Sequence, residues 1–167
     1  MLRYKMLIAV LFLLSACKNE SQNALGAEQA SQEVGFDYRK MPKRVEINEK
    51  ASDILDQWEE FGNFSRSFDI LYRARNNADL ILALDDLIEK EKLLAASDHP
   101  KLFDKAQIKS RQKVVRTFLL KARALAVENR DPTEAIVEML EAYNAYRNQF
   151  NVLVNNPLDS KLILDEE

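Results

Sequence analysis

Apolar residues recur at steps of three and four along most of residues 42–157. This spacing places them along one side of a helix. Prolines divide the region into three long proline-free stretches, 43–99, 101–131 and 133–156. Each stretch is rich in residues that favour helices. The pattern therefore predicts an all-α fold, with an antiparallel bundle of three or four helices over this region.

The first stretch, 43–99, is compatible with either one helix or two. Its apolar residues keep one phase up to Tyr72 and follow a second phase from Leu80 onward. Either a turn at 75–77 separates two helices, with Asn77 as the N-cap, or one helix continues with a rotated face. We favour the turn.

The next two helices are joined by the sequence Asn-Arg-Asp-Pro. The first of them is expected over Lys101–Glu128. Asn129 can adopt the left-handed conformation that closes a helix, while Asp131 suits the N-cap and Pro132 the first helical position. A link this short makes the two helices antiparallel neighbours.

The first residues of the chain follow another pattern. Arg3 and Lys5 supply positive charge, Met6–Leu14 is an unbroken apolar run, and Ser15-Ala16-Cys17 follows it. A basic start, a short apolar segment and small residues before a cleavage point are the parts of a secretory signal. The run is much shorter than the roughly 20 residues that span a bilayer as a helix. Residues 1–16 are therefore predicted to be a signal peptide.

The ending Leu14-Ser15-Ala16-Cys17 resembles the lipobox of bacterial lipoproteins. The resemblance implies that a diacylglycerol is attached to the Cys17 sulfur, that signal peptidase II cleaves before Cys17, and that the new amino terminus carries a further acyl chain such as palmitate. Cys17 is the only cysteine, so lipidation accounts for a thiol that has no partner for an internal disulfide. The alternatives are an ordinary buried thiol, or a signal cut by the general peptidase.

The same resemblance implies a compartment. Such a lipoprotein is anchored to a membrane of the bacterial cell envelope, outside the cytosol and in the periplasm. Lys18 follows the cysteine, at the position where aspartate favours inner-membrane retention in Gram-negative sorting, so the outer membrane is favoured over the inner one. One acyl chain holds a protein only marginally, whereas several make the attachment stable.

A polar segment, 17–41, lies between the predicted anchor and the helices, and it is rich in Ser, Gln, Asn, Glu and Ala. It lacks a sustained apolar period and cannot bury enough surface to fold, so it is predicted to be a flexible tether. A short helix near Ala24–Glu33 that packs on the domain is the alternative. The residues after the last helix, 158–167, are expected to form a short acidic tail.

Composition narrows the function classes. The chain carries 24 basic and 27 acidic residues, and loss of Arg3 and Lys5 with the signal peptide changes its net charge from −3 to −5. A mildly acidic chain is not a general nucleic-acid binder. Only three glycines and four prolines occur, fewer than in an average protein, which agrees with a mostly helical domain.

His99 is the only histidine, and it precedes Pro100 in a predicted loop. A catalytic triad, a general base or a metal site that used histidine would have to be built around it. The sequence contains no Glu-x-x-His, His-Glu-x-x-His or Cys-x-x-Cys-His motif and no phosphate-binding glycine loop. We therefore expect no enzyme activity, no metal and no cofactor, and we expect His99 to face solvent.

The helix predicted after Pro100 carries many basic residues opposite its apolar side. Between Lys101 and Arg123 there are eight basic residues and one acid, Asp104. Five of the basic residues lie close together around the helix, and we call them the basic stripe: Lys105, Lys109, Lys113, Arg116 and Arg123. The stripe would bind an anionic partner, or it would form a solvated face. We favour the solvated face, partly neutralised by Asp79, Asp85, Asp86, Glu89 and Glu91.

Aromatic residues form the other candidate site. They recur at helical spacing in the first and last stretches, and such residues are usually core. The alternative is a cleft for an apolar ligand or a client peptide. Because a buried tyrosine hydroxyl needs a hydrogen-bond partner, the two later tyrosines are expected near the edge of the domain. The candidate cleft residues are Trp58, Phe61, Phe68, Tyr72, Tyr143 and Tyr146.

These observations predict a membrane-anchored lipoprotein of the cell envelope that acts by binding. Its partners would be the membrane, through the lipid on Cys17, and a protein of the envelope for which the helical domain is a scaffold. A ligand-binding or chaperone-like domain that uses the aromatic cleft is the first alternative. An immunity or inhibitor lipoprotein is the second.

Overall fold

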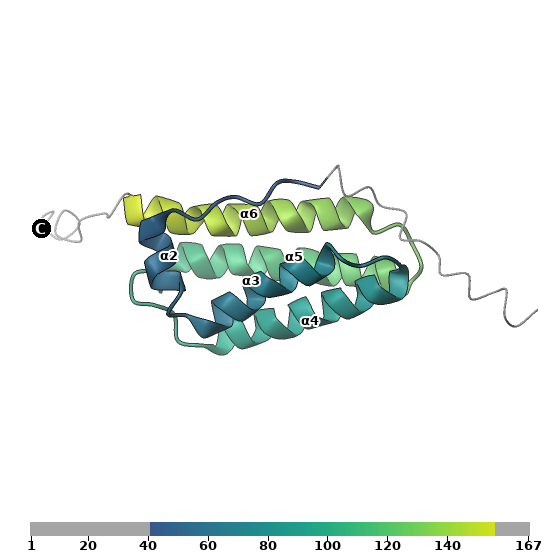
Figure 1. The fold of residues 1–167 in the computed structure, drawn as a ribbon. Helices are drawn as coiled ribbons and strands as arrows, with labels where there is room; N and C mark the ends of the chain where they lie inside the picture. The colour runs from purple at the N-terminus through teal and green to yellow at the C-terminus, as the bar shows by residue number, and fades with distance from the viewer. Residues whose placement is uncertain (1–40, 156–167) are drawn as a thin grey trace, which may run out of the picture. The chain divides into compact units, whose positions relative to one another are not determined.

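The computed structural model describes residues 41–155. The signal peptide, Cys17, the predicted tether up to residue 40 and the acidic tail lie outside the described residues. The described part is helical, with no β-strand in residues 41–155 (Figure 1). Its helices are α2 (Glu49–Leu55), α3 (Glu59–Leu71), α4 (Asn77–Ala96), α5 (Ala106–Val127) and α6 (Thr133–Asn155).

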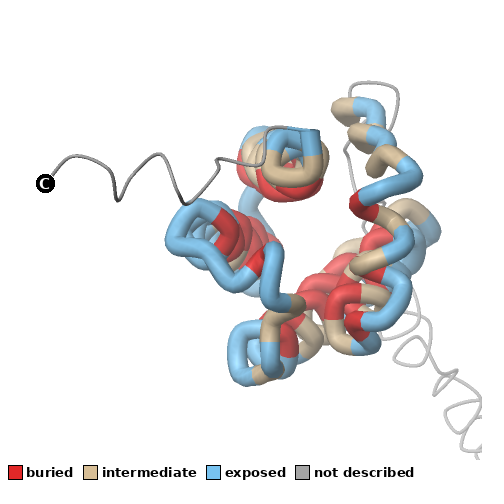
Figure 2. Tube along the Cα trace, turned by 90° about the vertical axis from the view of Figure 1, so that its left-hand side faces the viewer, coloured by how far each residue is buried: buried red, intermediate tan, exposed pale blue. Residues whose placement is uncertain are grey.

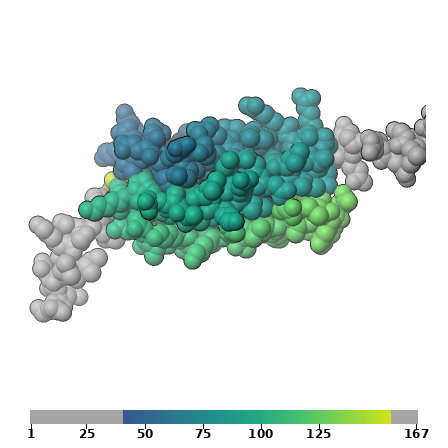
Figure 3. Space-filling view, turned by 90° about the horizontal axis from the view of Figure 1, so that it is seen from below, coloured from purple at the N-terminus to yellow at the C-terminus, as the bar shows by residue number. Residues whose placement is uncertain are grey.

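The four longer helices pack in a series. α4 packs against α3 and α5, and α5 packs against α6, while the short helix α2 contacts α3 and α6. Figure 2 looks along the helices and shows their buried residues on the sides that face a shared interior. On the face drawn in Figure 3, α4 lies between the residues of α3 and those of α5. The amphipathic spacing in the sequence thus produces one common core.

The turn favoured in the first stretch is present, and its cap is one residue earlier than expected. Asn76 is the N-cap of α4, and its Oδ1 accepts a hydrogen bond from the Asp79 backbone N–H at 2.8 Å. Asp79 Oδ2 in turn accepts from Asn76 Nδ2 at 3.1 Å. A second break at residues 56–58 separates α2 from α3. The apolar spacing did not predict this break, because Trp58 is buried and continues the spacing of the buried residues in α2 and α3.

The expected start of the next helix at Lys101 is wrong, because α5 begins at Ala106. The preceding residues form a tight turn, in which the Phe103 backbone N–H donates to the Pro100 carbonyl at 2.7 Å. Phe103 is fully buried, with its ring 4.8 Å from that of Phe150 on α6. The turn therefore inserts an aromatic anchor between the helices.

In the link between α5 and α6, Asn129 and Asp131 behave as the sequence predicted, and α6 begins at Thr133, one residue after the predicted first helical position, Pro132. Asn129 has the left-handed conformation, with φ of 53°. Asp131 Oδ1 accepts hydrogen bonds from the backbone N–H and the hydroxyl of Thr133, at 2.9 and 2.5 Å. These bonds stabilise the carboxylate and lower the pKa of Asp131. The anion also lies at the positive end of the α6 dipole, where it stabilises the helix.

Residues 43–48, which we call the strap, lie along α6 before α2 begins (Figure 1). Asn144 accepts from the Val45 backbone N–H at 2.9 Å and donates to the Lys43 carbonyl at 2.8 Å. Asn151 likewise accepts from Asn48 N–H at 2.9 Å and donates to the Glu46 carbonyl at 2.8 Å. The two asparagines are seven residues, or two helical turns, apart on α6. Their side chains form the backbone hydrogen bonds that a neighbouring β-strand would otherwise provide to the strap.

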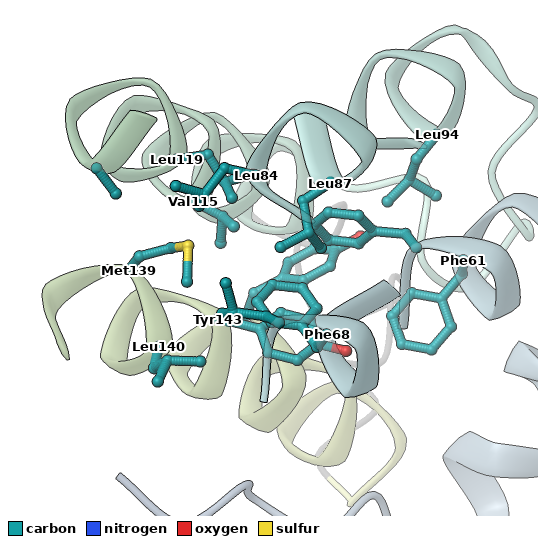
Figure 4. Packing of buried hydrophobic residues seen from close by; sticks show 14 of the residues in the cluster. Phe61, Phe68, Leu84, Leu87, Leu94, Val115, Leu119, Met139, Leu140 and Tyr143 are labelled. Carbon is teal, nitrogen blue, oxygen red and sulfur yellow. The ribbon is translucent and has the colours of Figure 1, made fainter. Parts of the chain in front are cut away.

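The centre of the core is aromatic. The rings of Phe68 on α3 and Tyr143 on α6 are stacked, with centroids 3.7 Å apart and planes 7° apart. Phe64 packs edge-on against both rings, at 5.2 and 5.8 Å. Figure 4 shows the aromatic rings beside the aliphatic part of the core. The labelled aliphatic residues are Leu84, Leu87, Leu94, Val115, Leu119, Met139 and Leu140.

We predict opposite behaviour for two leucines on α4. Leu87 is fully buried, whereas Leu82 is 69% exposed. Leu87→Ala leaves a cavity in the core and should lower the free energy of unfolding by about 2–5 kcal/mol. Leu82→Ala keeps the same helix and the same change of side chain and should stay within about 0.5 kcal/mol. Urea unfolding followed by circular dichroism measures both, and equal losses would contradict the observed core.

Candidate functional site

The basic stripe is largely neutralised by acidic residues. Arg116 Nη1 lies 2.7 Å from Glu91 Oε2, and Lys109 Nζ lies 2.5 Å from Asp104 Oδ1. Arg123 Nε donates to Asp85, which raises the pKa of the guanidinium. The two remaining members, Lys105 and Lys113, are exposed and take part in none of the ion pairs formed within residues 41–155. The five residues therefore do not form a continuous surface of free positive charge.

Glu91 has a place in the core that sequence reasoning missed. Its side chain is 2% exposed. It lies four residues after Leu87 and three before Leu94, both fully buried, and so on the apolar side of α4. Its carboxylate accepts from Gln112 Nε2 at 3.1 Å and from Arg116 Nη1 at 2.7 Å. The pairing satisfies the buried charge and joins α4 to α5, so this acid has a structural role.

His99 does not face solvent as the sequence suggested. It is half-buried, and its ring centroid lies 4.6 Å from that of Trp58. Its Nδ1 donates to the Ser97 carbonyl at 3.2 Å. Trp58 Nε1 also donates to Ser97 Oγ at 2.8 Å. The only histidine is thus packed against the tryptophan at the end of α4.

The six aromatic candidates do not line one cleft. Five of them are core residues that are at most 4% exposed, and Tyr72 is half-buried. The expectation that Tyr143 and Tyr146 lie near the edge is wrong. The Tyr143 hydroxyl donates to Ser65 Oγ at 3.0 Å, whereas the Tyr146 hydroxyl is buried and has no hydrogen-bond partner among residues 41–155. Removal from water raises the pKa of Tyr146 well above 10.0.

A groove opens beside this core, where the strap, α2, α3 and one side chain of α6 meet. Its volume is about 490 Å³, within the range of small-molecule sites. Ile47, Leu55, Trp58 and Phe61 supply its apolar walls. Two of the candidate cleft aromatics, Trp58 and Phe61, therefore do line a cavity.

Arg147 of α6 lines the groove and is its least expected residue. It is only 7% exposed. Its Nε donates to the Val45 carbonyl at 2.7 Å, and its Nη1 has longer contacts with Tyr143 Oη at 3.3 Å and Ser65 Oγ at 3.4 Å. These acceptors are neutral, and no ion pair formed within residues 41–155 includes Arg147. The guanidinium also lies over the Tyr143 ring, with Cζ 5.6 Å from the ring centroid. The groove therefore has a buried guanidinium that is held by neutral groups and by an aromatic face, without a carboxylate partner.

Arg147 could have been noticed in the sequence. It follows Tyr143 by four residues and precedes Phe150 by three, and both neighbours are fully buried. A charged residue at that spacing lies on the apolar side of its helix. The groove itself carries no such signal, because only the fold brings Arg147 of α6 to the strap, α2 and α3.

The rim of the groove carries exposed charges. Four lining carboxylates are exposed, those of Glu46, Asp56, Glu59 and Asp69. Asp69 is paired with Arg44 at 2.6 Å. The negative charges thus lie at the mouth, and the buried positive charge of Arg147 lies inside.

Gly62 lines the groove and, having no side chain, leaves space there. A Cβ built at this position would lie 3.3 Å from Arg66 Nη1, the end of a flexible side chain. Arg66 folds back over α3 and donates to Asn63 Oδ1 at 2.6 Å. A larger side chain at position 62 would therefore displace Arg66 and narrow the groove.

Residues 41–155 contain neither a membrane-spanning helix nor a cluster of metal ligands. No helix there is both long enough and apolar enough to cross a membrane. In the same residues, no group of three or more histidine, cysteine or carboxylate side chains is arranged to hold a metal ion.

The two buried tyrosines should respond in opposite ways to loss of their hydroxyl. Tyr146→Phe removes a buried hydroxyl without a partner and should raise the free energy of unfolding by about 1 kcal/mol. Tyr143→Phe removes the bond to Ser65 and should lower it by about 1–2 kcal/mol. Urea unfolding at pH 7 distinguishes them, and a loss at position 146 as large as that at 143 would contradict the observed environments.

The raised pKa of Tyr146 also predicts a loss of stability in alkali. Above pH 10 the unfolded chain loses the tyrosine proton while the folded protein keeps it, so the free energy of unfolding falls as pH rises through this range. The fall should be smaller in Tyr146→Phe than in the unmodified protein. Unfolding curves between pH 9 and 11 measure the difference, and identical slopes would rule out Tyr146 as a contributor.

Comparison with known proteins adds no relative to this description. No family model, curated protein or solved structure matches the chain. The function is therefore inferred from the chain's own residues.

Proposed function

We propose that this protein is a lipid-anchored lipoprotein of the bacterial cell envelope and that it acts by binding, not by catalysis. The observation that carries the anchor is the sequence Leu14-Ser15-Ala16-Cys17 directly after the apolar run Met6–Leu14. A thiol at that position is the acceptor for diacylglycerol in lipoproteins. Two or more acyl chains would hold the protein on a membrane almost permanently, with the outer membrane favoured over the inner one.

The groove supports the binding role. It combines some apolar side chains, a buried guanidinium and a charged mouth in about 490 Å³, a volume within the range of small-molecule sites. His99, the residue around which histidine-based catalysis would be built, packs against Trp58. Ligand binding at this groove replaces the aromatic cleft as the specific form of the hypothesis.

The proposed domain is an antiparallel helical bundle. Five residues or fewer connect α3 to α4 and α5 to α6, and helices joined by such short links run in opposite directions. The direct packing of α3 on α4, α4 on α5 and α5 on α6 supports the same arrangement. Such a bundle would hold most of the groove on helices.

A scaffold role is the second candidate, and one surface feature favours it. Ile70 and Leu82 are 51% and 69% exposed, and they border a hollow of about 270 Å³ where α3 meets α4. Exposed apolar residues that gather in one place often mark a protein interface. Crosslinking in native membranes, followed by purification, should yield one recurrent envelope protein, and Leu82→Glu should reduce its yield. Repeated recovery of the uncrosslinked monomer would contradict the scaffold role.

The anchor is tested by changing its acceptor. Cys17→Ser removes the sulfur and should move the protein from the membrane pellet to the soluble fraction, with loss of label from an alkyne analogue of palmitate. His99→Ser is a matched control outside the signal and should leave fractionation and labelling unchanged. Mass spectrometry of the wild-type protein should find an amino-terminal Cys17 that carries a diacylglycerol on its sulfur and an acyl chain on its amino group. A free thiol, or a terminus that still includes Met1, would disprove the anchor.

A further inference from the structure

We infer that the groove binds a small zwitterion with an apolar body, the chemistry of an apolar amino acid. Its carboxylate would pair with Arg147, its apolar part would pack against Trp58 and Phe61, and its ammonium group would face the acidic mouth. This inference rests on the proposed binding function and assigns it a ligand class.

The carboxylate follows from the state of Arg147. A guanidinium has five N–H donors in a planar fork that matches a carboxylate. In this protein Nε is used by the Val45 carbonyl, Nη1 makes only contacts of 3.3 Å or more, and Nη2 has no hydrogen bond to any residue of 41–155. Burial of a charge is costly unless an opposite charge or strong hydrogen bonds compensate it. A carboxylate in the groove supplies both.

The apolar body follows from the walls. Trp58 and Phe61 are stacked at 5.9 Å, and each exposes only 3–4% of its surface. Leu55 and Ile47 line the groove beside them. An aliphatic or aromatic group would bury the small apolar surface that these residues still expose in the groove, whereas a fully polar anion such as phosphate would not.

The ammonium group follows from the mouth. Glu46, Asp56 and Glu59 line the groove, are exposed, and form none of the ion pairs within residues 41–155. These carboxylates repel a simple anion that approaches Arg147, and they attract a cation. A molecule that carries both charges satisfies the interior and the mouth together.

A purely structural role for Arg147 explains less of the geometry. The bond from Nε to Val45 is sufficient to hold the strap, and Asn144 and Asn151 already bind the same segment on both sides. A neutral donor would make that bond without burying a charge. The free edge of the guanidinium therefore needs another explanation, and a ligand carboxylate provides it.

Three related probes test the inference on the full-length lipidated protein in detergent micelles. They are L-phenylalanine, 3-phenylpropanoate, which lacks the ammonium group, and phenethylamine, which lacks the carboxylate. Trp58 is the only tryptophan and lines the groove, so its fluorescence reports occupancy, and calorimetry gives the affinity. Phenylalanine should bind, and each analogue should bind about tenfold or more weakly, the loss expected for one charged hydrogen-bonding group.

Two variants test the location. Arg147→Gln should weaken phenylalanine binding by about tenfold or more and should abolish the preference over phenethylamine. Gly62→Leu adds a side chain to a wall of the groove and changes none of the residues that bond Arg147, so it should also weaken binding. It keeps the test decisive if Arg147→Gln fails to fold. Lys113→Gln, on the exposed face of α5, is the control and should bind as the unmodified protein does.

Three results would overturn the inference: no binding of phenylalanine, unchanged binding in a folded Gly62→Leu variant, or equal affinity for 3-phenylpropanoate. The proposed function is tested separately by the lipid on Cys17 and by crosslinking in membranes. A lipidated protein that crosslinks to an envelope partner but binds none of the probes would retain the binding role and lose this ligand.

Discussion

The stacked pair of Phe68 and Tyr143 is the contact on which the rest of the domain depends. α3 and α4, α4 and α5, and α5 and α6 pack directly on each other. α3 and α6 instead meet through large side chains, with ring centroids 3.7 Å apart and Phe64 edge-on to both. Aromatic rings at this junction bury much apolar area and also fix relative orientation. They make one core from a series of helices whose two ends would otherwise be open.

Because α3 and α6 meet through side chains, the space beside the Phe68 and Tyr143 rings is not filled by apolar residues alone. Near the Tyr143 hydroxyl the apolar filling ends, and the strap and α2 cover the junction only partly. Polar atoms are then needed where the core meets the opening, and Ser65, Tyr143 and Arg147 supply them within 3.4 Å of one another. The groove is thus a product of the same packing that closes the core.

The sequence predicted what local chemistry determines. The all-helical fold followed from apolar spacing, and Asn129 and Asp131 followed from the few residues that suit a left-handed closure and an N-cap. The break before α3 and the late start of α5 were not predicted, because Trp58 and Phe103 are buried without interrupting the pattern. These helix boundaries depend on packing between helices, which the apolar spacing of one helix does not predict.

The groove was beyond prediction for a related reason. It joins Ile47, Leu55, Phe61 and Arg147, which lie up to 100 residues apart, and only the fold brings them together. The pairing of acids on α4 with bases on α5 was easier to foresee, since both helices were predicted to be neighbours. Glu91 nevertheless looked like a surface acid until its burial was observed.

The arginines differ in whether their charge is available to bind a ligand. Arg116 and Arg123 have carboxylate partners on α4, so an incoming anion would have to displace an existing pair, and the exchange would contribute little net free energy. Arg147 has only neutral acceptors and an unoccupied edge in a partly enclosed space. A ligand there would compensate a desolvated charge without breaking any ion pair. A ligand carboxylate that reaches Arg147 would therefore displace no existing ion pair, whereas one that binds Arg116 or Arg123 would.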